Sequence, residues 1–119
     1  MESQEKDLRM RTKKFAQRVI RLFAALPKSA AAQVLGKQLL RSGTSVGANY
    51  REAWRGRSRA EFAAKIGDCL READESAYWL ELLLEEDFFA TARLQPLLAE
   101  ANELVAIFAT IAKKARSDT

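Results

Sequence analysis

Hydrophobic residues recur at three- and four-residue steps in four separate segments of the chain. Side chains at this spacing share one face of an α-helix, so each segment predicts an amphipathic helix. We expect helices over residues 4–26, 30–55, 59–86 and 94–115. Helix-forming residues dominate, and no segment shows the apolar–polar alternation of a half-buried strand.

The predicted helix ends carry recognisable signals. Pro27 ends the first helix, because the residue before a proline avoids the helical conformation. Ser29 offers an N-cap hydroxyl to the second helix, and Ser58 with Glu61 three residues later forms a capping-box signature for the third. Pro96 falls in the expected first turn of the fourth helix, where proline is tolerated. Short connections make successive helices antiparallel neighbours, so residues 1–119 predict one all-α domain, an antiparallel up-down-up-down four-helix bundle.

Two glycines, Gly43 and Gly47, interrupt the second predicted helix. Each costs about 1 kcal/mol relative to alanine in a helix interior. Such a cost indicates a close helix approach, a kink or a local break, and the sequence leaves these three open. Cys69, the sole cysteine, falls on the apolar stripe of the third helix, so we expect an inert, buried thiol.

Composition fits a folded protein that stays in the cytoplasm. Hydrophobic residues make up 48% and charged residues 30%, and the net charge of +4 permits attraction to nucleic acid without requiring it. Residues 1–14 contain no apolar signal segment. The longest strongly apolar uncharged stretch, residues 104–112, is far shorter than the roughly 20 residues of a membrane span, so we expect no membrane association.

A polar face on the second helix is the most informative local feature. Four polar residues at three- and four-residue steps make up this face: Ser42, Ser45, Asn49 and Glu52. A second polar row, on the third helix, could face the first: Asp68, Glu72, Glu75, Ser76 and Trp79. One interpretation is a buried polar seam that satisfies the helix around its glycines, and the other is a carboxylate metal site. The chain contains no histidine, which removes Glu-x-x-His metal ligands and histidine-based catalysis, so we expect no metal, no cofactor and no catalytic residue.

Arginines gather around the turn between the second and third helices, beside Tyr50 and Trp54. Arginines next to aromatic rings can hold phosphate and stack on bases, which predicts a nucleic-acid-binding surface. The alternative is a solvated helix end, in which the arginines pair with Glu52, Glu61 and Glu72. The candidate nucleic-acid-binding residues are Arg51, Arg55, Arg57, Arg59 and Arg71.

Several apolar residues lie off the main stripes of their helices. A bundle of this size cannot easily bury every apolar side chain, so we expect these to be exposed and covered by self-association. They are Tyr50, Trp54, Trp79, Leu83 and Ile107.

Three segments carry a family resemblance: QLLRSGTSVGANYREA at 38–53, SRAEF at 58–62 and EADESAYWL at 72–80. Through them, from about Leu8 to Lys114, the chain resembles the bacterial four-helix-bundle proteins encoded by 23S ribosomal RNA intervening sequences. That family is similar to the accessory protein of diversity-generating retroelements, a basic pentamer that binds reverse transcriptase and nucleic acid. The resemblance implies a homopentamer without catalytic residues. Its motif falls on six positions that we interpret as structural or interface residues, with Trp79 beside them: Ser42, Ser45, Asn49, Glu52, Glu72 and Glu75.

We therefore expect a non-enzymatic, homo-oligomeric interaction protein that binds structured RNA or a nucleoprotein partner. A rival function is a purely structural or regulatory protein–protein module whose arginines are only solvated. A third is a metal-dependent hydrolase that uses Glu52, Glu72 and Glu75.

Overall fold

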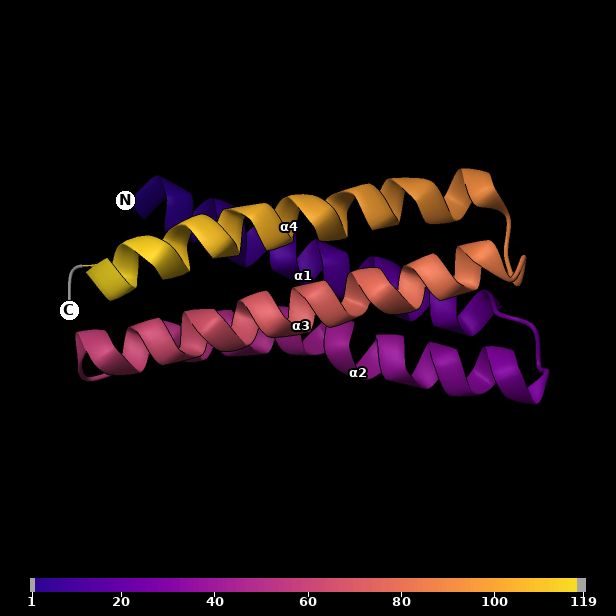
Figure 1. Ribbon diagram of the computed structural model, residues 1–119, viewed down its shortest axis with the longest axis horizontal. Coiled ribbons are helices and arrows are strands. Elements are labelled where there is room, and N and C mark those ends of the chain that lie inside the picture. Colours follow the sequence, from indigo (N-terminus) through magenta and orange to yellow (C-terminus); the bar gives the residue numbers. More distant parts are fainter. Residues whose placement is uncertain (1, 118–119) are drawn as a thin grey trace.

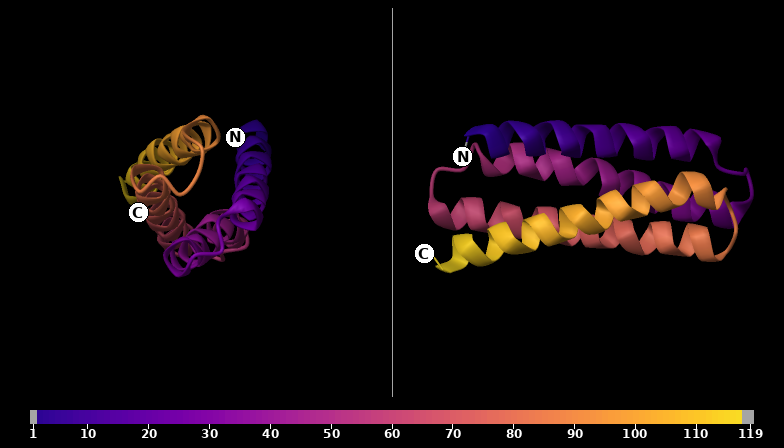
Figure 2. Two further views of the ribbon diagram at one scale, coloured as in Figure 1. Left: turned by 90° about the vertical axis from the view of Figure 1, so that its right-hand side faces the viewer. Right: turned by 90° about the horizontal axis from the view of Figure 1, so that it is seen from above.

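The computed structural model describes residues 2–117, which form four helices and, within that range, no strand. The helices are α1 (Glu2–Ala25), α2 (Ala30–Ala53), α3 (Arg59–Glu85) and α4 (Thr91–Ser117). They run back and forth along the long axis of a rod measuring 46 × 23 × 19 Å (Figure 1). The end-on view shows them arranged around a common centre (Figure 2). The predicted all-α four-helix bundle is confirmed.

The capping signals act at the predicted places, with one difference. The Ser29 hydroxyl accepts a hydrogen bond from the Ala32 N–H at 3.4 Å, and the Ser58 hydroxyl accepts one from the Glu61 N–H at 3.1 Å. The Glu61 carboxylate accepts from the N–H of Arg57 at 2.6 Å, one residue before the position that a capping box uses. Both helix starts are therefore satisfied by side chains.

The turn between α3 and α4 is tighter than expected, and it corrects the prediction for Pro96. The N–H of Phe88 bonds to the carbonyl of Leu83 and the N–H of Asp87 to that of Leu84, the two bonds of a Schellman motif. The tight turn lets α4 begin at Thr91, three residues earlier than the sequence indicated. Pro96 therefore lies in the second turn, where its missing N–H removes one intrahelical hydrogen bond on an exposed face.

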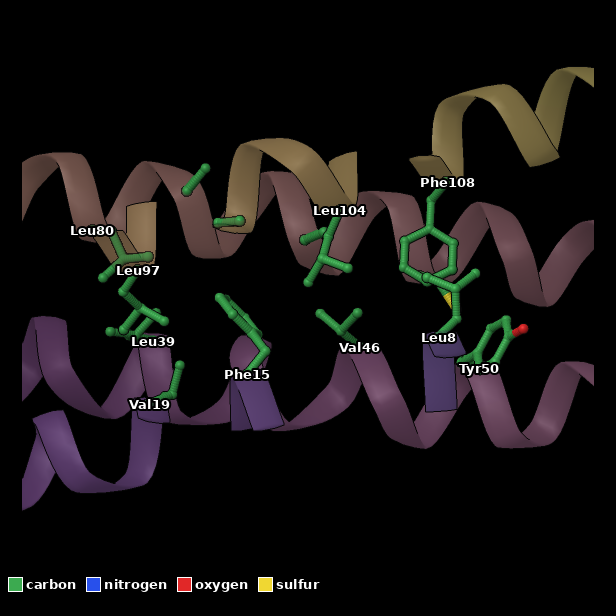
Figure 3. Close-up of a cluster of buried hydrophobic side chains, with 14 of the residues drawn as sticks. Leu8, Phe15, Val19, Leu39, Val46, Tyr50, Leu80, Leu97, Leu104 and Phe108 are labelled. Atoms are coloured by element: carbon green, nitrogen blue, oxygen red, sulfur yellow. The ribbon is translucent and has the colours of Figure 1, made fainter. Parts of the chain in front are cut away.

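The core follows the apolar stripes of all four helices (Figure 3). Cys69 is fully buried in it, and burial raises the pKa of its thiol to about 12. The expected burial of the cysteine is confirmed, and the raised pKa favours the protonated, unreactive form of the thiol at neutral pH. Ten residues from the four helices, each at most 3% exposed, illustrate the core: Leu8, Phe15, Val19, Leu39, Val46, Tyr50, Leu80, Leu97, Leu104 and Phe108.

The expectation of exposed apolar residues is only partly correct. Tyr50 and Leu83 are buried inside the bundle, because their helices turn these positions toward the core. Trp79 and Ile107 are half-buried, whereas Trp54 is 40% exposed as predicted. The large apolar side chains exposed by 40% or more are Met10, Ile20, Val34, Trp54 and Tyr78.

The glycines of α2 allow a close approach to α1, which answers the question the sequence left open. α2 is continuous through both positions, without a break. A Cβ atom at Gly43 would lie 2.9 Å from a methyl carbon of Val19, and one at Gly47 would lie 3.1 Å from the Thr12 hydroxyl. The contact at Gly43 is too short for a Cβ atom and the one at Gly47 is tight, so the absent Cβ atoms let the two helices pack closely.

α4 is the one helix among residues 2–117 that is long and apolar enough to cross a membrane, judged by length and composition alone. Its apolar stripe packs into the bundle through residues such as Leu97 and Phe108. Glu100 on the flank of α4 makes two hydrogen bonds to the guanidinium of Arg11 on α1, at 2.7 and 3.1 Å. Core packing accounts for part of the apolar character of α4, since 28% of its most apolar 18-residue window is buried in the bundle.

Candidate nucleic-acid interface

The predicted polar seam is reduced to one buried pair of hydroxyl groups. Ser42 on α2 and Ser76 on α3 are fully buried, and their hydroxyl oxygens lie 2.9 Å apart. Each oxygen also lies within hydrogen-bonding distance of a carbonyl of its own helix, Leu39 for Ser42 and Glu72 for Ser76. Because a slip of either helix would separate the pair, this contact fixes the register of α2 against α3.

The other predicted members of the polar face lie outside that seam. The Ser45 hydroxyl donates to the carbonyl of Arg41 at 2.6 Å, and the Asn49 amide donates to the carbonyl of Ser45 at 3.0 Å. Glu52 is exposed and forms an ion pair with Lys65 on α3 at 2.6 Å. Ser45 and Asn49 therefore bond to their own helix, whereas Glu52 links α2 to α3.

Arg41 organises the carboxylates of α3. Its guanidinium bonds to Glu72 at 3.2 Å and also to Glu75, whose carboxylate in turn accepts the indole N–H of Trp79 at 3.0 Å. The sequence predicted that Glu72, Glu75 and Trp79 lie on one polar row of α3, but it did not identify Arg41 as their partner. Within the described part of the chain, no group of three or more acidic or cysteine side chains is placed to hold a metal ion.

Four of the five candidate arginines are exposed at the α2–α3 end of the bundle: Arg51, Arg55, Arg57 and Arg59. Arg71 is not part of this group. It lies twelve residues after Arg59 on the same helix, about 18 Å along the axis, and pairs with Asp68 at 2.6 Å. The sequence placed it too near the turn because α3 runs straight away from that end.

The acidic residues expected to neutralise these arginines are engaged elsewhere. Glu52 pairs with Lys65, Glu72 pairs with Arg41, and Glu61 caps the start of α3 through a backbone N–H. Among residues 2–117, the side chains of Arg51, Arg55 and Arg57 take part in no ion pair. The ion pairs that the alternative expected for these three arginines therefore do not form among the described residues, and their side chains are exposed to solvent.

α1 adds two cations that the sequence reasoning missed. A groove of about 470 Å³ runs between α1 and α2, with Arg9 and Lys13 on one wall and Arg51 and Arg55 on the other. Its lining includes Gly47, where a Cβ atom would lie 3.1 Å from the Thr12 hydroxyl oxygen of α1. We call this the α1–α2 groove, and its lining residues are Arg9, Thr12, Lys13, Ala16, Thr44, Gly47, Ala48, Arg51, Glu52 and Arg55.

One sequence signal could have identified this side of the molecule. Between Leu8 and Arg51 the chain carries ten lysines and arginines and no aspartate or glutamate. The net charge of the whole chain is only +4, because acidic residues concentrated on α3 and in the turn that follows it offset the basic residues of this run. The charge of the bundle is therefore divided between a basic α1–α2 side and an acidic α3.

Comparison with known proteins gives the family. The sequence matches the 23S rRNA-intervening sequence protein family over residues 4–110. A similar solved structure is a protein of unknown function from the S23 ribosomal protein family of Bacteroides thetaiotaomicron. It is 35% identical, with a TM-score of 0.84, and the alignment covers 92% of this chain and 97% of that one. A comparison with curated proteins finds no match. Because the family match spans most of the chain, this protein belongs to the 23S rRNA-intervening sequence proteins.

Proposed function

We propose that this protein is a non-enzymatic, self-associating interaction module that binds RNA, free or within a nucleoprotein, through the basic side formed by α1 and α2. The observation that carries the proposal is the α1–α2 groove. Lys13, Arg51 and Arg55 line it without an ion-pair partner among the described residues. Cations without internal partners can neutralise phosphates and release counterions, which is the main source of affinity for nucleic acid.

The division of charge supports one orientation of the RNA. α3 carries seven acidic residues against three basic ones, and Glu86 and Asp87 follow it directly. An acidic surface repels phosphate, so the strand should lie over α1 and α2 and avoid α3. The acidic helix then limits where RNA can bind.

The binding test is a salt titration with matched variants. We expect the affinity for a structured RNA to fall steeply as salt rises, because each phosphate contact releases counterions. Replacing Arg51 and Arg55 by glutamine should lower affinity and reduce the slope of log K against log salt by about 0.7–0.9 per lost contact. Arg71→Gln, on α3, should leave both quantities unchanged.

The outcomes of this titration separate the proposal from its rival. Absence of RNA binding at low salt would remove the RNA function and leave a protein–protein module. A loss in the Arg71 variant half as large as that in the Arg51/Arg55 double variant, and so equal per charge removed, would show that binding follows total charge, not the α1–α2 groove.

Self-association is supported by exposed apolar side chains and by the family resemblance. Val34 on α2 and Tyr78 on α3 are 61% and 52% exposed, and a second copy would bury such groups. We expect light scattering behind a sizing column to give a mass of about 67 kDa, five copies of the 13.4 kDa chain. A mass of one chain across micromolar concentrations would contradict self-association.

A further inference from the structure

A second groove opens at the end of the bundle where α2 meets α3. Toward its C-terminal end, α4 tilts away from α1 (Figure 2). The groove, of about 430 Å³, lies between the N-terminal end of α1 and the C-terminal end of α4. Apolar side chains form much of its surface, and the exposed indole of Trp54 is the largest of them. We call it the Trp54 groove, and its lining residues are Gln4, Trp54, Arg59, Phe62, Thr110, Ile111, Lys114 and Ala115.

A series of aromatic rings holds Trp54 in place from the core outward. Phe108 and Tyr50 are buried, with ring centroids 5.7 Å apart. Tyr50 in turn meets Trp54 edge-on at 6.3 Å, and Phe62 meets the indole at 5.1 Å and 68°. These contacts restrict the indole while leaving it 40% exposed, so it is a preorganised flat surface rather than a loose side chain.

The Trp54 groove and the α1–α2 groove share no lining residue, but both reach the C-terminal end of α2. Arg55 lines the α1–α2 groove and follows Trp54 directly in the chain. Two cationic side chains, Arg59 and Lys114, also line the Trp54 groove. An apolar, aromatic site with cations in its lining suits an occupant with a flat ring attached to negative charge.

We propose that the Trp54 groove receives an unpaired base of an RNA strand whose adjoining phosphates lie in the α1–α2 groove. This inference rests on the proposed RNA-binding function and narrows its ligand to single-stranded RNA, or to a loop or bulge of a structured one. A base within a duplex stays paired and stacked, so a continuous duplex offers only its phosphates and 2′-hydroxyls to a protein surface. A base freed from pairing can stack on Trp54.

Fluorescence of Trp54 tests the inference directly. The chain has two tryptophans, so Trp79→Phe leaves Trp54 as the reporter. The probes are a 12-nucleotide single-stranded RNA, the same strand in a blunt duplex, a mononucleotide and inorganic polyphosphate. We expect the single strand to quench the indole, and we expect the duplex and polyphosphate to bind without quenching. The mononucleotide should produce no quenching at concentrations where the strand saturates, because it lacks the phosphates for the α1–α2 groove.

Variants of Trp54 test whether the stacked base contributes to RNA affinity. Trp54→Leu should weaken single-strand binding roughly tenfold, the size expected for loss of one stacked base, and should leave duplex affinity unchanged. Trp54→Phe keeps a ring and should restore most of the affinity. Phe89→Leu removes a half-buried aromatic ring in the turn between α3 and α4, at the opposite end of the bundle, and should change neither affinity. Circular dichroism on each variant checks that the bundle remains folded.

The outcomes distinguish the base site at Trp54 from RNA binding through the α1–α2 groove. Equal affinity for strand and duplex, with no quenching and no effect of Trp54→Leu, would overturn the base site and leave phosphate-driven RNA binding intact. A mononucleotide that binds as tightly as the strand would also overturn it. Failure of every RNA probe to bind would overturn the proposed function itself.

Discussion

Gly43 and Gly67 both occupy helix interiors, but their surroundings differ. At Gly43 a Cβ atom would press on two methyl carbons of Val19, at 2.9 and 3.1 Å, whereas at Gly67 it would meet nothing within 4 Å. Gly43 therefore serves the contact between α1 and α2, and Gly67 has no packing role of this kind.

This difference predicts opposite effects of alanine on the free energy of unfolding. Gly67→Ala should raise it by about 1 kcal/mol through helix propensity. Gly43→Ala gains the same propensity but forces α1 and α2 apart, and overpacking typically costs about 1–3 kcal/mol, so we expect a net loss of about 1 kcal/mol. Urea unfolding followed by circular dichroism measures both. A stabilised Gly43→Ala variant would contradict the close helix approach.

Single residues also show what the sequence could not supply. Tyr50 was expected to be exposed, yet it continues the buried series of Leu39 and Val46 on α2, and the ring of Phe108 packs against it. In the sequence, nothing distinguishes Arg41 from the other arginines. In the structure it forms ion pairs with Glu72 and Glu75 of α3. Partners of this kind depend on which helices become neighbours, and periodicity along one helix does not contain that information.

At the scale of the elements, Asp87 is the least favourable backbone position in the described chain. It is the only residue other than glycine with a positive φ among residues 2–117, at 56°, and it ends α3 in a Schellman motif. Glycine adopts this conformation without the steric cost that a Cβ atom brings.

Asp87→Gly should therefore raise the free energy of unfolding by about 1 kcal/mol, and Asp87→Val should lower it. Thermal unfolding of the two variants beside the native chain provides the measurement. If glycine proved neutral and valine harmless, the turn would not hold the left-handed conformation.

The sequence predicted where the helices lie more accurately than where each helix begins and ends. Pro27, Ser29 and Ser58 marked their boundaries to within about two residues, because caps and prolines act locally. The start of α4 differed from the prediction because the Schellman turn before it has Asp87, and not glycine, at the position that usually identifies such a turn in a sequence. Pro96 then appeared to mark a first turn that lies one turn earlier.

At the scale of the molecule, the candidate site is assembled from two helices that the sequence analysis treated separately. The arginines of the α2–α3 end were predicted, but Arg9 and Lys13 join them only because Gly43 and Gly47 bring α1 close to α2. The acid-free run from Leu8 to Arg51 was available in the sequence, yet the net charge of the whole chain concealed it.

Photo-crosslinking shows where RNA lies on the molecule, and so decides whether it binds over α1 and α2. A single-stranded RNA carrying a photoreactive base would be bound at low salt and irradiated, and the crosslinked peptides would be identified by mass spectrometry. We predict crosslinks within residues 9–21 of α1 and residues 44–62 around the end of α2. Crosslinks confined to the outer face of α3, around Arg71 and Tyr78, would contradict RNA binding on the α1–α2 side.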